Sequence, residues 1–441
     1  MGLIEISLPS METHKFTGRD LALLLPLFLI LIAATLQRST AGLTLLELGL
    51  LVGIPGLGVW TFLIWRWTSS GTKAIIPRSV VWLLLIGVWS IGSIFPAIAN
   101  GVDVISWGRR LFPIIVLVTV TLITFFTIRS RGHLTFLYLS LVGIEIIAVL
   151  IPLLGLASID ISTISNLQYL RDFGRGQHAG FLMALLLPAF VGYQRLNRVQ
   201  QTAAVIGFVI SGVGLFISFS RTMWIATAAA IGFTTVVCLH QHRLSLETLI
   251  FGTLGALFAT TFTSLVTPGR LLIFLVERMR SIPNALQNAS FRDRVFELQG
   301  LLTDAVTNPL MLFVGHGWGA EYTFYSVNRY SWGGIGWTSN AYSHNYYAYL
   351  LWSVGVVGLI FFVFYWKLVF RDALRVLLND ELDRDGLYLL GCMATTVSLL
   401  VSSLTAPLLN DVKWCVIFGV ISGILIYIVH DRPNENAIID N

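Results

Sequence analysis

Long apolar runs alternate with short polar segments along most of the 441-residue chain. A hydrocarbon core of about 30 Å is crossed by roughly 17 to 25 helical residues. Twelve runs approach or reach this length, at 20–36, 43–65, 79–98, 111–128, 134–155, 178–194, 203–218, 222–239, 246–266, 346–369, 386–406 and 413–430. The pattern predicts an all-α integral membrane protein with about twelve transmembrane helices, forming one domain over residues 1–441.

One long polar segment, Thr267 to Asn345, interrupts this pattern between the ninth and tenth predicted spans. Within it, apolar residues recur at helical spacing at Val295, Leu298, Leu301 and Leu302. This spacing predicts amphipathic helical structure lying along the membrane surface. Irregular backbone survives at a membrane only where water or protein satisfies it, so we expect the chemistry to reside in this segment.

Composition and charge support a membrane protein with a defined orientation. Only 12% of the residues are charged, against about 25% in soluble domains. Lys and Arg are more frequent in the connections on the side of the N-terminus, and positively charged connections stay in the cytoplasm. This bias predicts cytoplasmic termini and an external long segment, and it explains the net charge of +5 without a nucleic-acid partner. The three cysteines, Cys238, Cys392 and Cys415, fall inside predicted spans, so no disulfide framework is expected.

Two helix starts on the outer side carry candidate chemistry. Ser220 and Arg221 open one span, where free backbone N–H groups, the helix dipole and a guanidinium form a plausible anion site. Ser343 is the expected N-cap of another span, which places His344 in its first turn, where the dipole disfavours the imidazolium form. A neutral histidine beside an anion site can accept a proton from a hydroxyl nucleophile. The alternatives are an arginine that reaches the membrane interface and a histidine that only hydrogen-bonds the loop.

Further positive charge is expected on the outer face. It comes from Arg109, Arg110, Arg171, Arg175, Arg292 and Arg294. Together these residues could bind a diphosphate. The histidines on this side match no metal-ligand spacing, so we predict neither a metal nor a cofactor. Glu145, in the middle of the fifth span, has no assigned role.

Aromatic residues are dense near the end of the long segment. Between Trp318 and Trp352 the chain places four Trp and seven Tyr, including Tyr347. This cluster favours a sugar-stacking surface, with Trp318 and Tyr347 as candidate glycan-binding residues, over the alternative of a headgroup-level aromatic belt. The glycines of Gly-His-Gly-Trp-Gly at 315–319 predict tight turns.

The order of four motifs resembles the O-antigen ligase and polymerase superfamily, whose members are polytopic membrane glycosyltransferases with one large outer loop. The motifs are Phe-Ser-Arg-Thr at 219–222, Arg-Asp-Arg-Val-Phe at 292–296, Gly-His-Gly-Trp-Gly at 315–319 and Ser-His-Asn at 343–345. The family pattern has a Trp where this chain has Phe296, which leaves the choice between Arg292 and Arg294 open.

The resemblance implies a GT-C-like fold and transfer of a glycan from an undecaprenyl diphosphate carrier to an acceptor hydroxyl. The reaction would occur on the periplasmic face of a bacterial inner membrane, without a metal and with inversion. His344 would remove the acceptor proton, while Arg221 and either Arg292 or Arg294 would stabilise the leaving diphosphate. The acceptor is a lipid A core sugar in a ligase, the end of a growing glycan in a polymerase, or a protein side chain. A multi-pass solute transporter is the alternative from another class.

Overall fold

Helices make up most of the part of the chain that the computed structural model describes, namely residues 24, 27–32, 53, 56, 76–157, 176–192, 198–241, 289–327, 335–379 and 382–439. In chain order the elements are α3 (Arg78–Gly92), α4 (Ile94–Ala99), α5 (Val104–Thr127), α6 (Arg131–Ala157), α8 (Gly176–Val191), α9 (Arg198–Ile217), α10 (Arg221–His240), α13 (Ala289–Thr307), α14 (Pro309–Val314), β1 (Tyr322–Ser326), β2 (Gly336–Asn340), α15 (Tyr346–Asn379), α16 (Arg384–Ser402), η4 (Leu408–Asn410) and α17 (Val412–Ile439). Seven apolar stretches within these residues are long enough to cross a membrane. The chain is a multi-pass membrane protein.

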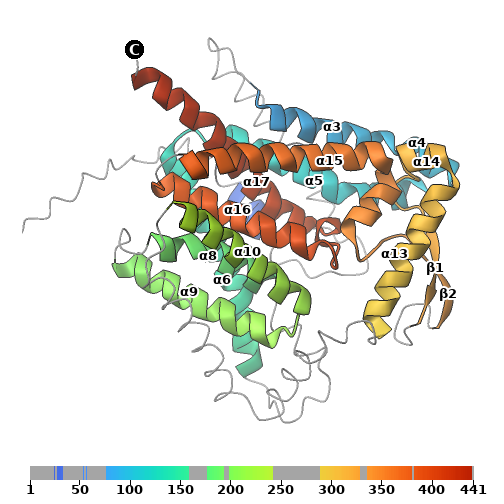
Figure 1. The fold of residues 1–441 in the computed structure, drawn as a ribbon, viewed down its shortest axis with the longest axis horizontal. Helices are drawn as coiled ribbons and strands as arrows, with labels where there is room; N and C mark the ends of the chain where they lie inside the picture. The colour runs from blue at the N-terminus through green and yellow to red at the C-terminus, as the bar shows by residue number, and fades with distance from the viewer. Residues whose placement is uncertain are drawn as a thin grey trace, which may run out of the picture.

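The long helices run side by side, and α13 with the two strands covers one end of the bundle (Figure 1). Helix α17 packs against α5, α16 packs against α8 and α10, and α15 packs against α3. Helices α16 and α17 are the most enclosed, with 72% and 78% of their apolar windows buried. These two helices form the centre of the bundle, while α3 lies at its surface with 33% buried.

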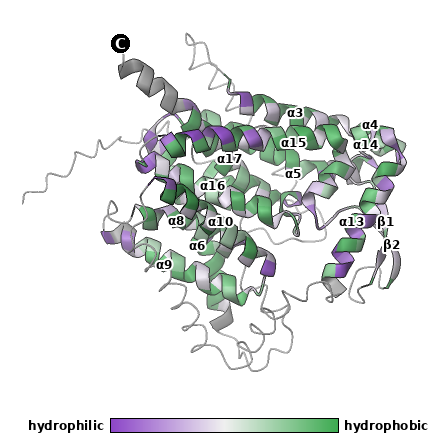
Figure 2. Cartoon of the chain, in the orientation of Figure 1, coloured by the Kyte–Doolittle hydropathy of each residue, from purple (hydrophilic) through white to green (hydrophobic). Residues whose placement is uncertain are grey.

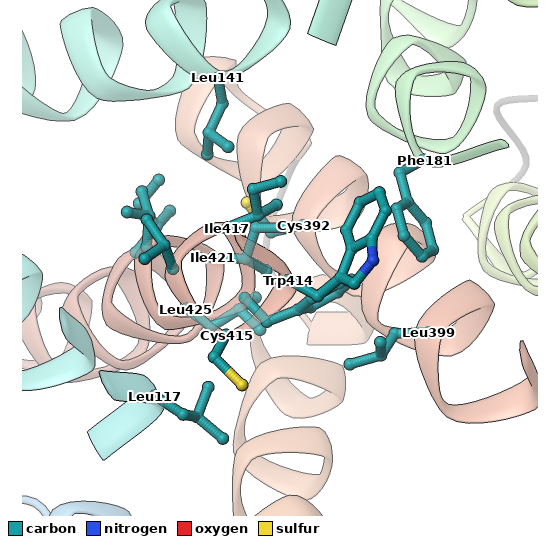
Figure 3. Close-up of a cluster of buried hydrophobic side chains, with 14 of the residues drawn as sticks. Leu117, Leu141, Phe181, Cys392, Leu399, Trp414, Cys415, Ile417, Ile421 and Leu425 are labelled. Carbon is teal, nitrogen blue, oxygen red and sulfur yellow. The ribbon is translucent and has the colours of Figure 1, made fainter. Parts of the chain in front are cut away.

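Aromatic and aliphatic side chains fill the centre of the bundle. Trp414 of α17 meets Phe181 of α8 edge to face, with ring centroids 5.2 Å apart (Figure 3). Cys392 and Cys415 are buried in the same cluster, and Cys238 is buried in α10. All three cysteines are free thiols inside helices, as the sequence predicts.

Nine of the twelve apolar runs coincide with described helices, from 79–98 in α3 and α4 to 413–430 in α17. Large apolar side chains of α3 are exposed, including Val81, Leu84 and Val88, as expected for a lipid-facing surface. Figure 2 shows that α3 is hydrophobic along most of its length. The run at 246–266 lies outside the described residues, as do most positions of the runs at 20–36 and 43–65. The total of about twelve spans therefore remains a prediction.

The outer segment contains a β-hairpin that the all-helical expectation missed. Strands β1 and β2 are antiparallel, with Tyr322 opposite Asn340 and Ser326 opposite Gly336. Along β1 buried and exposed residues alternate strictly. This period of two is the signature of a half-buried strand, but the residue types do not show it, because Tyr325 is exposed and Ser326 is buried.

The amphipathic helix predicted in the outer segment is α13, and its buried face packs against the hairpin. Leu301 is fully buried in a small cluster with Tyr322 and Trp352, and Leu298 packs against that cluster. Val295 and Leu302, which were expected on the same apolar face, are 42% and 40% exposed. The apolar stripe is therefore narrower than predicted, and Leu298 and Leu301 pack against other parts of the protein.

Helix α15 is broken at Gly355, whose backbone has a φ of 69° and a ψ of −174°. Gly315, with a φ of 88°, lies directly against this break. A Cβ atom on either residue would overlap the backbone of the other segment. All three glycines of the 315–319 motif have positive φ angles, which confirms the predicted turns.

The break in α15 is also where the outer segment is attached. The N–H groups of His316 and Gly317 donate to the carbonyl oxygens of Trp352 and Ser353, at 2.8 and 3.0 Å. The indole Nε1 of Trp352 donates back to the carbonyl oxygen of Ala320 at 3.0 Å. These bonds give hydrogen-bond partners to backbone N–H and carbonyl groups of both segments. Unpaired backbone groups that are buried would destabilise the fold.

We expect Gly355→Ala to destabilise the protein by about 1–3 kcal/mol, because alanine avoids a positive φ and its Cβ would overlap the backbone of Phe313. Thermal unfolding in detergent, followed by intrinsic fluorescence, measures the effect. Gly232→Ala is the matched control, since Gly232 lies inside α10 and the added methyl group would enter open space. Equal melting temperatures for the two variants would contradict this account of the break.

Candidate active site

The N-terminus of α15 shows how the Ser-His-Asn motif is held. Asn345, rather than Ser343, is the N-cap, because its Oδ1 accepts from the N–H of Ala348 at 3.0 Å. Ser343 Oγ instead accepts from the N–H of Asn345 at 3.2 Å. The predicted cap is therefore wrong by two residues, and His344 lies just before the helix rather than in its first turn.

His344 is paired with the carboxylate of Glu297, which lies outside the four sequence motifs. Its Nδ1 lies 2.9 Å from Glu297 Oε2, and its backbone N–H donates to Glu297 Oε1 at 3.2 Å. The side chain of His344 is 39% exposed, whereas that of Glu297 is 3% exposed. No described residue pairs with Nε2 of His344, so the far edge of the ring is available to a substrate.

Tyr322 completes the surroundings of Glu297. Its hydroxyl lies 2.6 Å from Glu297 Oε1 and 2.8 Å from the carbonyl oxygen of Tyr342. Burial, and secondarily the nearby charge of Glu297, raises the pKa of the Tyr322 hydroxyl. Tyr322 therefore stays protonated and can donate to the carboxylate.

Arg221 is the first residue of α10 and follows a strained turn. Only residues 218–220 separate α9 from α10, and Phe219 is buried with a φ of 49°. Among the described residues it is the one non-glycine position with a positive φ. Ser220 occupies the N-cap position but its side chain makes no capping bond. Such strained backbone is concentrated at functional sites, and here it sets the direction in which α10 and Arg221 begin.

The start of α10 and the start of α15 each form a hydrogen bond to the connection that follows α16. Thr222 Oγ1 lies 2.7 Å from Thr405 Oγ1, in the connection that follows α16. Two residues earlier in that connection, the carbonyl oxygen of Ser403 accepts from the N–H of Tyr346 at 2.9 Å. Residues 403–405 thus bridge the two helix starts and bring the Arg221 and His344 regions to the same end of the bundle.

Arg110 belongs to the same neighbourhood through Tyr342. The Arg110 guanidinium lies over the Tyr342 ring, 5.6 Å from its centroid. The Tyr342 and His344 rings are 5.8 Å apart. Arg109, the preceding residue of α5, is exposed, and Arg171 and Arg175 lie outside the described residues.

The geometry distinguishes Arg292 from Arg294. Successive helical residues are rotated by about 100°, so Arg294 lies about 60° from Glu297 around α13 and Arg292 about 140°. Arg292 is exposed, with its guanidinium 5.9 Å from the Phe296 ring, whereas Arg294 is half-buried. Arg294 is therefore on the side of the helix that faces the His344 region.

The aromatic cluster divides into packing residues and an exposed pair. Trp318 is fully buried, and its ring meets Tyr349 edge to face at 5.3 Å. Tyr347 is half-buried and donates its hydroxyl to the carbonyl oxygen of Leu400 at 2.7 Å. By contrast, Trp337 is 78% exposed and Tyr325 is 42% exposed, with their rings 5.7 Å apart on the hairpin. The structure thus gives Trp318 and Tyr347 packing contacts and leaves the Trp337–Tyr325 pair open to ligands.

The other two histidines expected on the outer side, His178 and His316, are in contact with neighbouring side chains of the protein. His178 Nδ1 lies 2.9 Å from Glu145 Oε2, and both side chains are almost fully buried, so this pair ties α8 to α6. The His316 ring is stacked on Trp352 at 3.7 Å. Burial lowers the pKa of His316, which keeps its ring neutral. Within the described residues, no three His, Cys, Asp or Glu side chains gather as a metal site would require.

These observations define a multi-pass helical membrane protein in which one segment covers a group of helix starts bearing a histidine and several arginines. Residues 206–363, from α9 to the first part of α15, match the family model described as O-antigen ligase. The resemblance drawn from the sequence motifs is confirmed over those residues, which carry the domain shared by O-antigen ligases and polymerases. No curated protein matches the chain.

Cysteine labelling can test the predicted orientation of this end of the bundle. Glu321 lies beside the hairpin and Arg371 lies about 35 Å further along α15 than its first residue, and both are exposed. With a membrane-impermeant maleimide on intact cells, we expect Glu321→Cys to react and Arg371→Cys to react only after permeabilisation. The native cysteines are buried and give a low background. The reverse pattern of labelling would contradict the orientation.

Proposed function

We propose that this protein is a glycosyltransferase of the bacterial inner membrane that acts on lipid-linked glycans at its periplasmic face. Its donor is a glycan on undecaprenyl diphosphate, and its acceptor is a sugar hydroxyl. The observation that carries the proposal is that the starts of α10 and α15, next to Arg221 and His344, are joined at one end of the bundle, within the segment that matches the O-antigen ligase model.

His344 serves as the general base in this proposal. Its Nε2 accepts the proton of the acceptor hydroxyl while the acceptor oxygen forms a bond to the anomeric carbon. The bond from that carbon to the diphosphate oxygen breaks, and the electron pair leaves with undecaprenyl diphosphate. Direct displacement inverts the anomeric configuration.

The arginines stabilise the leaving group. Negative charge develops on the diphosphate as its bond to the sugar breaks, and fixed guanidinium groups can stabilise it in place. Arg221 and Arg294 are assigned to this role, because the exposed Arg292 lies on the far side of α13. Arg110, and the outer residues Arg109, Arg171 and Arg175, contribute positive charge that attracts the donor.

The identity of the acceptor distinguishes an O-antigen ligase from a polymerase, which carry out the same class of reaction. A lipid A core sugar as acceptor defines an O-antigen ligase, which we rank slightly ahead. The end of a growing glycan as acceptor defines a polymerase with the same donor chemistry. Purified protein incubated with lipid-linked repeat units separates them, since a polymerase gives a ladder of products without added core and a ligase gives a core-linked product.

In that assay we expect His344→Ala to lower kcat at least about 100-fold, the contribution typical of a general base, while lipid-linked donor still binds. We expect Arg221→Ala to weaken turnover as well. His240→Ala is the matched control, because His240 is an exposed histidine at the opposite end of α10. Full activity of His344→Ala would refute the assigned base, and solute uptake without any transfer product would favour a transporter.

We assign glycan contact to the exposed Trp337–Tyr325 pair rather than to the packed Trp318 and Tyr347. Trp337→Ala is expected to raise KM for the glycan substrate about 3- to 10-fold with little change in stability, whereas Trp337→Phe retains most of the stacking. Ile335→Ala is the control, since Ile335 is an exposed apolar residue beside β2. If Trp337→Ala leaves KM unchanged but reduces insertion into lipid vesicles, the pair belongs to an interfacial aromatic belt instead.

A further inference from the structure

We propose that Glu297 is a positioning residue for His344, which fixes the ring with hydrogen on Nδ1 and leaves Nε2 as the proton acceptor. The proposal rests on the proposed function for its kinetic consequence, but the tautomer itself is a property of the free protein. Nothing in the sequence motifs singles out Glu297, which stands 47 residues before His344 in the chain.

The hydrogen-bond geometry determines the tautomer. An ionised carboxylate can only accept hydrogen bonds, so with Glu297 ionised the 2.9 Å contact between Glu297 Oε2 and Nδ1 places a hydrogen on Nδ1. In a neutral imidazole the other nitrogen then carries the lone pair. That nitrogen, Nε2, is on the exposed edge of the ring, where an acceptor hydroxyl can approach.

Glu297 is itself fixed from three directions. Its carboxylate accepts hydrogen bonds from the Tyr322 hydroxyl, from the backbone N–H of His344 and from the His344 imidazole. Glu297 is only 2% exposed. The hydroxyl is on β1, the carboxylate is on α13 and the histidine is at the start of α15. The ring of His344 is therefore oriented only when α13, the hairpin and α15 are assembled.

Other contacts attach α13 to the hairpin without Glu297. Asp304 Oδ2 accepts from the N–H of Thr323 at 3.2 Å, and Asp293 Oδ1 accepts from the N–H of Val327 at 3.0 Å. These two carboxylates secure the helix on either side of Glu297 along the same face. The bond from Glu297 to His344 is thus separable from the task of holding α13 in place.

Substitution kinetics test the positioning role. Glu297→Gln keeps the shape of the side chain, but its amide can present N–H groups to Nδ1 and so stabilise the tautomer with hydrogen on Nε2. We expect kcat to fall at least about 100-fold with KM nearly unchanged, because the base is lost and the binding surface is not. Glu297→Asp, which restores an acceptor-only group, should recover part of kcat. Asp304→Asn is the matched control on the same helix and should keep kcat within about threefold.

A spectroscopic measurement separates this inference from the proposed reaction. Nitrogen NMR of protein labelled with ¹⁵N-histidine reports the tautomer, and the His344→Gln variant assigns the signal. We expect hydrogen on Nδ1 in the unmodified protein and a shift towards Nε2 in Glu297→Gln. An unchanged tautomer together with normal kcat in Glu297→Gln would overturn the inference while leaving His344 as the base. Full activity of His344→Gln would instead overturn the proposed function.

Discussion

The arrangement of the outer end of the molecule depends on the break in α15 at Gly355. Backbone N–H groups of the outer segment bond to carbonyl oxygens beside the break, so that segment is attached directly to α15. The indole of Trp352, three residues before the break, packs against Tyr322 edge to face at 5.7 Å. Tyr322 then contacts Glu297, and Glu297 contacts His344. An unusual backbone conformation inside a membrane helix is thus connected, contact by contact, to the orientation of one imidazole ring.

The same region joins elements that are far apart in the chain. The strained turn at Phe219 sets the start of α10, and the 403–405 connection ties that start to the beginning of α15. Both helix starts carry the positive end of a helix dipole, which favours an anionic ligand. A diphosphate with a sugar attached fits this environment better than a neutral solute does. In the proposed function the outer segment supplies Arg294 and the exposed aromatic pair, so it would take part in the site as well as cover it.

Hydropathy predicts most of the fold, because crossing a hydrocarbon core requires long apolar helices that are visible in the sequence. The chain order of the motifs around Arg221 and His344 likewise predicts which part of the molecule holds the candidate site. The sequence does not locate the N-cap of α15, because Ser343 and Asn345 are both good caps and only the bond to the N–H of Ala348 decides between them. Burial of Trp318 depends on packing against Tyr349, so composition alone could not separate it from the exposed Trp337. The sequence does not single out Glu297, because Asp293 and Asp304 lie on the same face of α13 and only the tertiary fold brings His344 to Glu297.

The most direct test of the account is a cryo-electron microscopy structure of the protein with a lipid-linked glycan donor bound. We predict the diphosphate within hydrogen-bonding distance of Arg221 and Arg294, the first sugar beside Nε2 of His344, and the lipid tail leaving sideways between helices. A diphosphate bound at the opposite end of the bundle, or at the outer end but away from His344, would contradict a single site built at the starts of α10 and α15.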